Sequence, residues 1–349
     1  MHLDTYSKGH SHIKVGTDVE YLGSKDGVIV PLTPQQLTGT KEDPLPIGEV
    51  ASLQLDNVLG EITFDPSDNA RDFSRSAHSA RYEVGHFMLE QFGMEAIYKP
   101  SHHFKSRQLI SSHARVLGCK PDKAANVEDE NEPVDVNQFR TLRTPGGHIH
   151  VSVPYQMCAD EVLKRVIMMD YWLGAPLTTH YRNGAERRTM YGQAGRFRFT
   201  NYPDGYSGFE YRTPDCQWFA DLTNSMADQV FYMVDQAMQI NLMQPSIKRA
   251  INMHPKLCAA INNSDMEGIR HAMKRTGMGE FMSEYNPNEY SKIDYTKPPA
   301  PKQTAGGGIP NWLNMPIMPS LHAHSESSGY TISTSNVALN DDGYQEEEF

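Results

Sequence analysis

The sequence predicts a fold that mixes β-strands with α-helices, of the α+β or α/β class. Short runs in which apolar and polar residues alternate are typical of strands, and longer runs in which apolar residues recur at helical spacing lie between them. The chain has 349 residues, 38% of them hydrophobic, which is enough to bury a large core. One domain of about 250 to 300 residues or two smaller domains would fit this length.

The first predicted elements are strands. Residues 14–22 alternate strictly, residues 27–31 form a short second strand, and residues 50–64 form two strands on either side of the turn signal Asp56-Asn57. Further strands are predicted around residues 146–153 and around Glu210. Because side chains two residues apart on a strand share a face, these elements present several polar pairs on one side.

The helices are predicted from apolar residues that recur every three or four positions. One helix is expected to begin near residues 65–67 and to end at Gly93, and two more are expected over residues 160–173 and 218–242. A last helix begins at the capping box Ser264 to Glu267 and ends at Gly277.

The composition changes at about residue 286, where Pro, Gly and Ser become frequent and branched apolar residues become rare. Such a segment buries too little apolar surface to offset the entropy of ordering. We therefore expect one folded domain over residues 1–285, followed by an extended or partly disordered tail over residues 286–349.

The charge balance argues against two classes of partner. Lys and Arg total 32 against 43 Asp and Glu, a net charge of −11, so no overall positive field would hold nucleic acid or an anionic membrane. No apolar run approaches the length of a membrane span, and the polar start of the chain has no signal-like apolar region. The four cysteines form no C-x-x-C pair. These features indicate a cytoplasmic protein with reduced thiols.

Three strands carry clusters of ionisable residues. Asp18 and Glu20 share one strand face, Glu61 lies among apolar residues after the Asp56-Asn57 turn, and His148 and His150 form an H-x-H pair behind a double glycine. Each pattern alone also fits an ordinary polar strand face. Together they offer carboxylates and imidazoles, which suit Mg²⁺ or Mn²⁺, and the double glycine would permit a ligand to approach the backbone closely.

A fourth region concentrates arginine in an otherwise acidic chain. It spans residues 182–212, is interleaved with glycines, and ends at Glu210 and Arg212, which share a strand face. Guanidinium groups match phosphate and carboxylate oxygens, so the segment indicates an anion pocket, although solvated loop charges remain an alternative. The sequence contains no P-loop, Rossmann, kinase or H-E-x-x-H motif.

Taken in order, these motifs resemble the carboxylate-amine ligases of the glutamine synthetase fold, in particular the phage COOH-NH2 ligase type 2, or amidoligase, group. The resemblance spans about residues 14–220. It rests on these segments: Gly16 to Glu20, Leu55 to Glu61, Gly118 to Asp122, Gly146 to Val151, Arg187 to Arg198 and Phe209 to Arg212. The first strand has Asp18 where glutamine synthetases have the first residue of Glu-x-Glu.

The resemblance implies an α+β fold in which a curved, mainly antiparallel sheet forms a funnel-shaped active site with helices on its outer face. It implies an ATP- and Mg²⁺- (or Mn²⁺-) dependent ligase that forms an amide or peptide-like bond through an acyl phosphate. The implied metal ligands are Asp18, Glu20, Glu61, His148 and Glu210. The implied nucleotide-binding residues are His150, Arg187, Arg188, Arg196 and Arg198. The implied catalytic residues are Asp56, Glu61, Arg198 and Arg212.

The partners implied are a carboxylate and an amine, each a small molecule or part of a peptide. Ligases of this fold are often oligomers, so a homo-oligomer is also an expectation, and the compartment would be the host cytoplasm if the chain is phage-encoded. Two alternatives stay open. One is a metal-dependent hydrolase or nuclease, since carboxylates with an H-x-H pair also activate water, and the other is a catalytically inactive protein that keeps the fold for binding or assembly.

Overall fold

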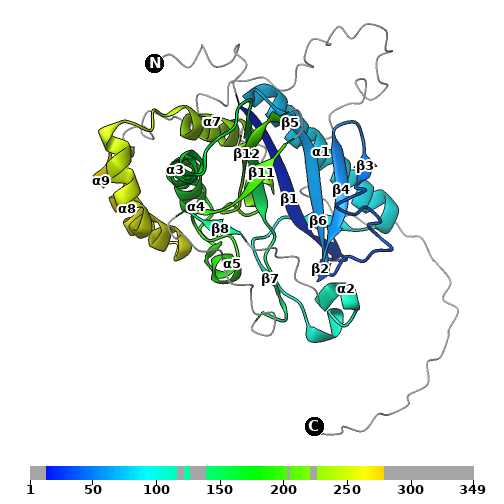
Figure 1. The fold of residues 1–349 in the computed structure, drawn as a ribbon. Helices are drawn as coiled ribbons and strands as arrows, with labels where there is room; N and C mark the ends of the chain where they lie inside the picture. Colours follow the sequence, from blue (N-terminus) through cyan, green and yellow to red (C-terminus); the bar gives the residue numbers. More distant parts are fainter. Residues whose placement is uncertain (1–12, 116–121, 126–138, 203–204, 221–225, 279–349) are drawn as a thin grey trace, which may run out of the picture. The chain divides into compact units, whose positions relative to one another are not determined.

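A computed structural model describes residues 13–115, 122–125, 139–202, 205–220 and 226–278 (Figure 1). All of them belong to one compact unit, which spans Met1–Ile293. The tail expected over residues 286–349 lies outside the described residues. The description below concerns this compact unit alone.

A large antiparallel sheet dominates the described part of the chain. Its main path runs in the order β3-β4-β5-β1-β10-β12-β11-β8, and β2 and β6 also pair with β1. The bounds are β1 (Lys14–Lys25), β2 (Val28–Val30), β3 (Leu45–Ile47), β4 (Ala51–Asp56), β5 (Leu59–Ser67), β6 (Glu95–Ile97), β8 (Lys123–Ala124), β10 (Gly147–Val153), β11 (Arg196–Asn201) and β12 (Ser207–Tyr211). A separate ladder joins β7 (His102–His103) to β9 (Leu142–Arg143).

The predicted strands are confirmed, including the hairpin of β4 and β5. Its two strands pair from Asp56 and Leu59 onward, and Asn57 in the turn has φ +58°, a conformation that asparagine tolerates better than most residues. The fold class is thus a mixture of helices with a large, mostly antiparallel sheet.

One face of the sheet is apolar and is covered by helices. Val19, Ile62, Ile149 and Phe209 are fully buried on this face. The helix α1 (Ala70–Phe92) packs against β4, β5 and β6, and α3 (Ala159–Met169) packs against β12 (Figure 1). The opposite face is left to the polar side chains that the strand alternation sets there.

Aromatic rings join the helical layer to the sheet. Phe73 of α1 lies 5.5 Å from Phe64 of β5, 6.2 Å from Trp218 of α6 (Gln217–Ala220) and 5.9 Å from Phe231 of α7 (Met226–Gln239), measured between ring centroids. Buried aromatic pairs contribute more than their area alone suggests. This contact fixes the helices against the central strands.

The helix α1 begins later than predicted. Strand β5 continues through Ser67, and Asn69 caps the helix by accepting a hydrogen bond from the backbone N–H of Asp72 at 2.9 Å. The expected entry at residues 65–67 was therefore wrong, because the sheet extends through that segment. The end at Gly93 is confirmed, with φ +59° in the left-handed region that favours glycine.

Three further differences concern helices near the C-terminal end of the unit. The helix predicted over 160–173 is α3 followed by one π-helical turn, Asp170–Gly174, and then α4 (Ala175–His180). The cap of α9 (Met266–Thr276) is Asp265 rather than Ser264, since the Asp265 carboxylate accepts from two backbone N–H groups. The periodicity analysis missed α8 (Pro245–Asn262).

The remaining short helices are α2 (Ser112–Arg115), α5 (Ala185–Met190) and the 3₁₀ turn Ser106–Gln108. Among the described residues, no helix combines the length and the hydropathy that a membrane crossing needs.

Candidate active site

The polar face of the sheet is organised around β1. Asp18 pairs directly with His148 on β10, and Glu20 pairs directly with Glu61 on β5. Directly opposite residues of an antiparallel pair project to the same side, so these four side chains share one face. The two-residue spacing of Asp18 and Glu20 therefore places one acid beside each neighbouring strand.

The register extends this row in both directions. On one side His150 pairs with Glu210 on β12, which in turn pairs with Arg198 on β11. On the other side Glu61 pairs with Gln54 on β4, two residues before Asp56. Strands from distant parts of the chain thus bring most of the predicted site residues onto one surface.

The first cluster contains Asp18, both histidines of the H-x-H pair and Glu210. The His148 Nδ1 atom lies 3.0 Å from Asp18 Oδ1 and 3.4 Å from Glu210 Oε1. The His150 Nε2 atom lies 3.3 Å from Asp18 Oδ2, and its Nδ1 atom lies 3.0 Å from the hydroxyl of Tyr202. Asp18 therefore bridges the two imidazoles.

The second cluster contains Glu20, Asp56 and Glu61. One ligand atom from each carboxylate lies within 4.8 Å of the others. The backbone N–H of Gly146 donates to Glu20 Oε2 at 2.6 Å, and Gln54 Nε2 donates to Glu61 Oε1 at 2.6 Å. These two donors orient Glu20 and Glu61, and the three carboxyl groups of the cluster lie close together.

Burial raises the pKa of Glu20 and Glu61 in the second cluster and of Glu210 in the first. Burial, followed by the charge of Asp56, raises the pKa of Glu20 to about 8. Burial and then Asp18 raise the pKa of Glu61 well above its ordinary value and bring the pKa of Glu210 to about 7. At neutral pH these groups can all ionise together only if positive charge is supplied among them.

The two histidines and Asp18 differ in their protonation. Burial lowers the pKa of His148 to about 3, so its imidazole is neutral at physiological pH. For His150 burial also acts downward, but Asp18 outweighs it and the pKa is raised. Burial acts upward on Asp18, yet the two imidazoles hold its pKa well below the ordinary value. Asp18 is therefore an anion in the folded chain.

The donor sets of both clusters suit divalent cations. Asp18, His150 and Glu210 place one ligand atom each within 4.8 Å of one another, as do the three carboxylates of the second cluster. Carboxylate oxygens with at most one imidazole are ligands that Mg²⁺ and Mn²⁺ accept, and a cation would offset the burial and the mutual repulsion that raise the pKa values. His148, predicted as a ligand, lies between Asp18 and Glu210. Asp56, predicted as catalytic, joins the second group.

Three arginines stand at the other end of the row. A guanidinium nitrogen of Arg198 lies 3.5 Å from Glu210 Oε2, and Arg212 contacts the other oxygen of the same carboxylate. Asp122 lies between Arg196 and Arg212, at 3.5 and 3.4 Å. The side chains of Arg196 and Arg198 keep 16% and 22% of their surface exposed, so both can still meet an anion that arrives from solvent.

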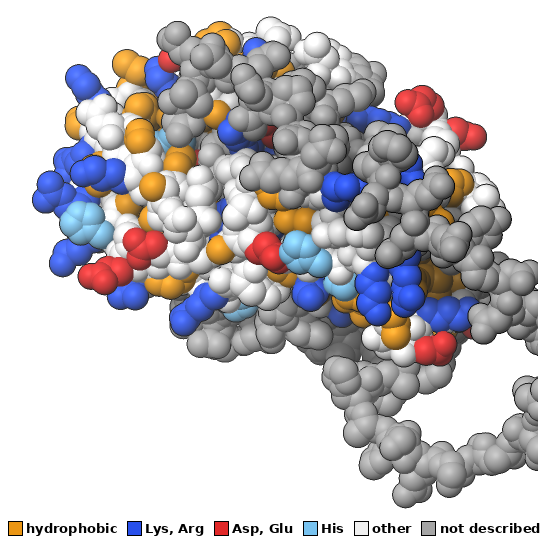
Figure 2. Space-filling view, turned by 90° about the horizontal axis from the view of Figure 1, so that it is seen from below, with side chains coloured by type: hydrophobic (Ala, Val, Ile, Leu, Met, Phe, Trp, Pro, Cys, Tyr) orange, Lys and Arg blue, Asp and Glu red, His pale blue; other side chains and the backbone are white. Residues whose placement is uncertain are grey.

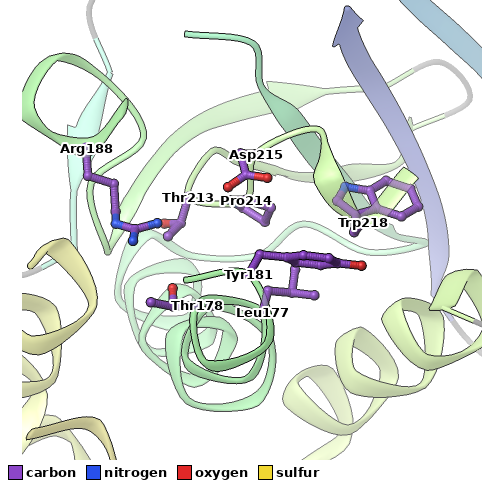
Figure 3. A pocket seen from close by; sticks show the side chains of 9 residues that line it. Leu177, Thr178, Tyr181, Arg188, Thr213, Pro214, Asp215 and Trp218 are labelled. Atoms are coloured by element: carbon purple, nitrogen blue, oxygen red, sulfur yellow. The ribbon is translucent and has the colours of Figure 1, made fainter. Parts of the chain in front are cut away.

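Two of the predicted nucleotide-binding arginines lie elsewhere. Arg187 is fully buried and donates to the backbone carbonyls of Arg212 and Thr213, at 3.2 and 3.0 Å. Arg188 donates to Ser264 Oγ at 2.6 Å and lines a small pocket with Asp215 (Figure 3). Arg187 therefore supports the segment that follows β12, and Arg188 is held by Ser264, next to the cap of α9.

The double glycine before the H-x-H pair serves packing inside the protein. A Cβ atom at Gly146 would lie 2.3 Å from His148 Nε2, and one at Gly147 would lie 2.6 Å from the indole nitrogen of Trp218. The expected approach of a ligand to this backbone is therefore wrong, because the side chains of His148 and Trp218 already fill the space.

Sequence reasoning missed three side chains that complete the site. Asp122 holds two arginines, Tyr202 contacts His150, and the ring of Tyr191 lies 4.7 Å below the guanidinium of Arg212. Asp122 and Tyr191 both fall within segments that carry the family resemblance. Neither residue belongs to a pair or a periodic pattern, so no signal in the sequence selects it.

Comparison with known proteins adds a family. The family model described as "Phage phiEco32-like COOH.NH2 ligase-type 2" matches residues 94–286, more than half of the 349-residue chain. No curated protein sequence matches this chain. The family match contains β10, β11 and β12 with their histidines and arginines, whereas the acids of β1, β4 and β5 precede it.

Solved structures show only distant likeness. "Apo GmaS without ligand" has a TM-score of 0.35 and 12% identity, with 84% of this chain and 74% of that chain covered. A bifunctional glutathione synthetase from Pasteurella multocida has a TM-score of 0.34 and 10% identity, with 78% of this chain and 49% of that chain covered. The complex between prokaryotic ubiquitin-like protein Pup and its ligase PafA has a TM-score of 0.29 and 9% identity, with 81% of this chain and 72% of that chain covered.

Proposed function

The chain belongs to the phage phiEco32-like COOH.NH2 ligase-type 2 family, and from this premise we propose that it is an ATP- and Mg²⁺- (or Mn²⁺-) dependent ligase that joins a carboxylate to an amine. One observation supports the proposal most strongly. Two clusters of carboxylate and imidazole ligands lie side by side on β1, next to partly exposed arginines. This arrangement offers metal sites and an anion site on the same face of the sheet.

The reaction needs an activated acid, because condensing a carboxylate with an amine is unfavourable in water. In the proposed reaction the substrate carboxylate oxygen bonds to the γ-phosphorus of ATP and ADP leaves, which gives an acyl phosphate. The amine nitrogen then attacks the acyl carbon, the phosphate leaves, and the amine loses a proton. Bound divalent cations would supply neutralising charge to the phosphate oxygens.

The residues of this chain have separate roles in the proposal. Asp18, His148, His150 and Glu210 hold one cation, and Glu20 with Asp56 and Glu61 holds a second. Arg196, Arg198 and Arg212 offset the negative charge that develops on the transferred phosphoryl group. Of the second cluster, Asp56 or Glu61 would accept the proton of the amine, once a cation keeps these carboxyl groups ionised.

The proposal is tested by Glu210→Gln and His148→Ala. Each removes a donor from the first cluster without changing the backbone, so Mn²⁺-dependent release of ADP should fall by about 100-fold or more. The assay contains ATP, Mn²⁺ and a panel of amino acids and amines. Glu90→Gln on α1 and His271→Ala on α9, both exposed, are the matched controls and should keep wild-type rates.

Retained turnover in both cluster variants would contradict the metal assignment. A wild-type protein whose melting temperature does not respond to ATP with Mn²⁺ would contradict the ligase proposal and favour a binding or assembly role. Metal-dependent bond cleavage without any nucleotide would instead favour the hydrolase alternative.

A further inference from the structure

A second cavity lies outside the carboxylate clusters. It has a volume of about 580 Å³, and α2, β9 and the turn Ser106–Gln108 contribute to its walls. This volume is in the range that small-molecule sites occupy. Its charged lining residues are Arg107, Arg115, Arg140 and Arg143.

The lining is strongly basic. Four of its residues are arginines, and no acidic residue is among those that line the cavity in the described part of the chain. Arg107, Arg115 and Arg140 are exposed, and none of the three forms an ion pair with a described carboxylate. These exposed guanidinium groups form a locally positive area that can bind an anion, although the chain as a whole carries −11.

Hydrogen bonds of a buried arginine tie together the floor of the cavity. Arg143 is only 3% exposed, and its guanidinium donates to Asn57 Oδ1 at 2.8 Å and to the carbonyl of Ala114 at 2.6 Å. The Asn57 side chain also donates to the carbonyl of His113 at 2.7 Å. The buried arginine therefore locks α2 to the β4–β5 turn and holds the wall of the cavity in place.

The face on which α2 lies is basic over several areas. Figure 2 views the molecule from below the orientation of Figure 1 and shows several groups of blue Lys and Arg side chains on this surface, with red Asp and Glu side chains among them. Ser106 and Thr141 add hydroxyl groups to the lining, which can donate to the same oxygens that arginines bind.

We propose that this cavity is a binding site for a small molecule that carries several carboxylate or phosphate groups. Guanidinium forks bind both kinds of oxyanion in bidentate fashion, and three exposed arginines around one cavity can engage more than one such group at a time. The site is distinct from the carboxylate clusters, which repel anions unless cations are bound.

The site is linked mechanically to the second cluster. Asn57, which Arg143 holds, directly follows Asp56, so an occupant that orders the cavity wall also stabilises the turn that carries this acid. The binding site itself requires no turnover for its test, and it stands or falls independently of the ligase proposal.

The test is isothermal titration of the full-length protein with citrate in one arm and inorganic pyrophosphate in the other, at constant ionic strength and without divalent cations. Arg115→Ala combined with Arg140→Ala should raise the dissociation constant of at least one probe by tenfold or more. Arg71→Ala combined with Arg75→Ala on α1 removes the same charge elsewhere and should stay within twofold of wild type.

The arms distinguish the ligand class and the site. Loss confined to citrate indicates a carboxylate ligand, and loss confined to pyrophosphate indicates a phosphate ligand. Because Arg198 offers a separate anion contact, Arg198→Ala is titrated in parallel, and it should leave the dissociation constant assigned to the cavity within twofold. If the double variant does not fold, Arg107→Ala and Arg140→Ala are used as single variants. Each should raise the dissociation constant by threefold or more.

Three results would overturn the proposal: no saturable binding of either probe to the wild-type protein, equal binding by the cavity variants and wild type, or an equal loss in the Arg71/Arg75 control.

Discussion

Asp122 connects the arginines of the site to one another. It is 4% exposed and touches both Arg196 and Arg212, whose guanidinium groups would otherwise repel each other. Because it contacts the arginines and not the reacting atoms, we regard it as a positioning residue. Its removal should change the orientation of the anion site more than the stability of the fold.

We predict that Asp122→Asn lowers kcat/KM for ATP by about 10- to 100-fold, because the neutral amide no longer holds two charged groups. A rise in the KM for ATP should accompany the loss, and Asp122→Glu should restore part of it. The measurement is steady-state ADP release. Asp160→Asn, whose side chain is 71% exposed, is the control, and a wild-type KM in Asp122→Asn would contradict the role.

Protons compete with cations for the carboxylates. Burial raises the pKa of Glu20 to about 8 and that of Glu210 to about 7, both from a usual value of 4.5. The folded chain then holds these protons more tightly than the unfolded chain. Their contribution to stability is full below about pH 4.5 and is lost as the pH rises toward 8.

A bound cation should reverse that loss. We predict that Mn²⁺ raises the melting temperature by about 3 °C or more at pH 8 and by less than about 1 °C at pH 5.5. Differential scanning fluorimetry with and without a chelator measures the effect. The Glu210→Gln variant should show a smaller response at pH 8, and an equal response at both pH values would contradict the proposed competition.

At the scale of single residues, the sequence predicted which side chains share a face of the sheet. It did not predict which arginines face the site and which are buried. The spacing of Asp18 with Glu20 and of His148 with His150 predicted shared faces, and the register confirms the shared faces. It was not predictable that Arg187 is fully buried under backbone carbonyls, since an arginine in a glycine-rich segment has the same local pattern whether it faces solvent or core.

Elements were predicted well where one periodicity dominated. The strand at residues 14–22 and the end of α1 at Gly93 followed from local chemistry alone. The start of α1 did not, because Asp65-Pro66-Ser67 suits a helix entry locally while pairing with β1 holds the same residues in β5. Long-range strand pairing overrode the local preference.

A buried polar network joins three elements behind the site. Asp170 in the π-helical turn is fully buried, accepts from the hydroxyl of Tyr211 on β12 at 2.5 Å, and lies 2.6 Å from His254 Nε2 on α8. Cys258, one turn later on α8, lies 3.2 Å from the same nitrogen. Tyr211 lies between Glu210 and Arg212 in the sequence, so this network supports the end of β12, where Glu210 lies, and the residue that follows it.

We predict that Asp170→Ala destabilises the protein by about 3 kcal/mol or more, because it leaves a buried imidazole and a buried hydroxyl without their acceptor. Denaturant unfolding measures the change. Lys164→Ala breaks an exposed pair with Asp160 and should cost less than about 0.5 kcal/mol. Similar losses in the two variants would contradict the ranking.

At the scale of the whole molecule, the net charge conceals local sign changes. The chain carries −11, yet acidic side chains gather in largely buried clusters on the sheet, while exposed arginines line the cavity near α2. The total charge argued against nucleic acid as a partner. It said nothing about small anions, whose binding depends on the local field.

The domain boundary near residue 285 remains a proposal from composition. We predict that a chain ending at residue 285 unfolds cooperatively with a melting temperature within about 2 °C of the full chain, because the removed residues have few apolar side chains to bury. Calorimetry measures both chains. A fall of 5 °C or more would show that the C-terminal segment contributes to the fold.

The sequence by itself determined which side chains share a strand face and which helix surfaces are apolar, because the periods of two and 3.6 residues are properties of the local backbone. Only the tertiary structure decided that Glu61 lies beside Glu20, that His150 faces Glu210, and that Asp122 joins two arginines. Strand order and register arise from contacts between distant residues, and no local period encodes them.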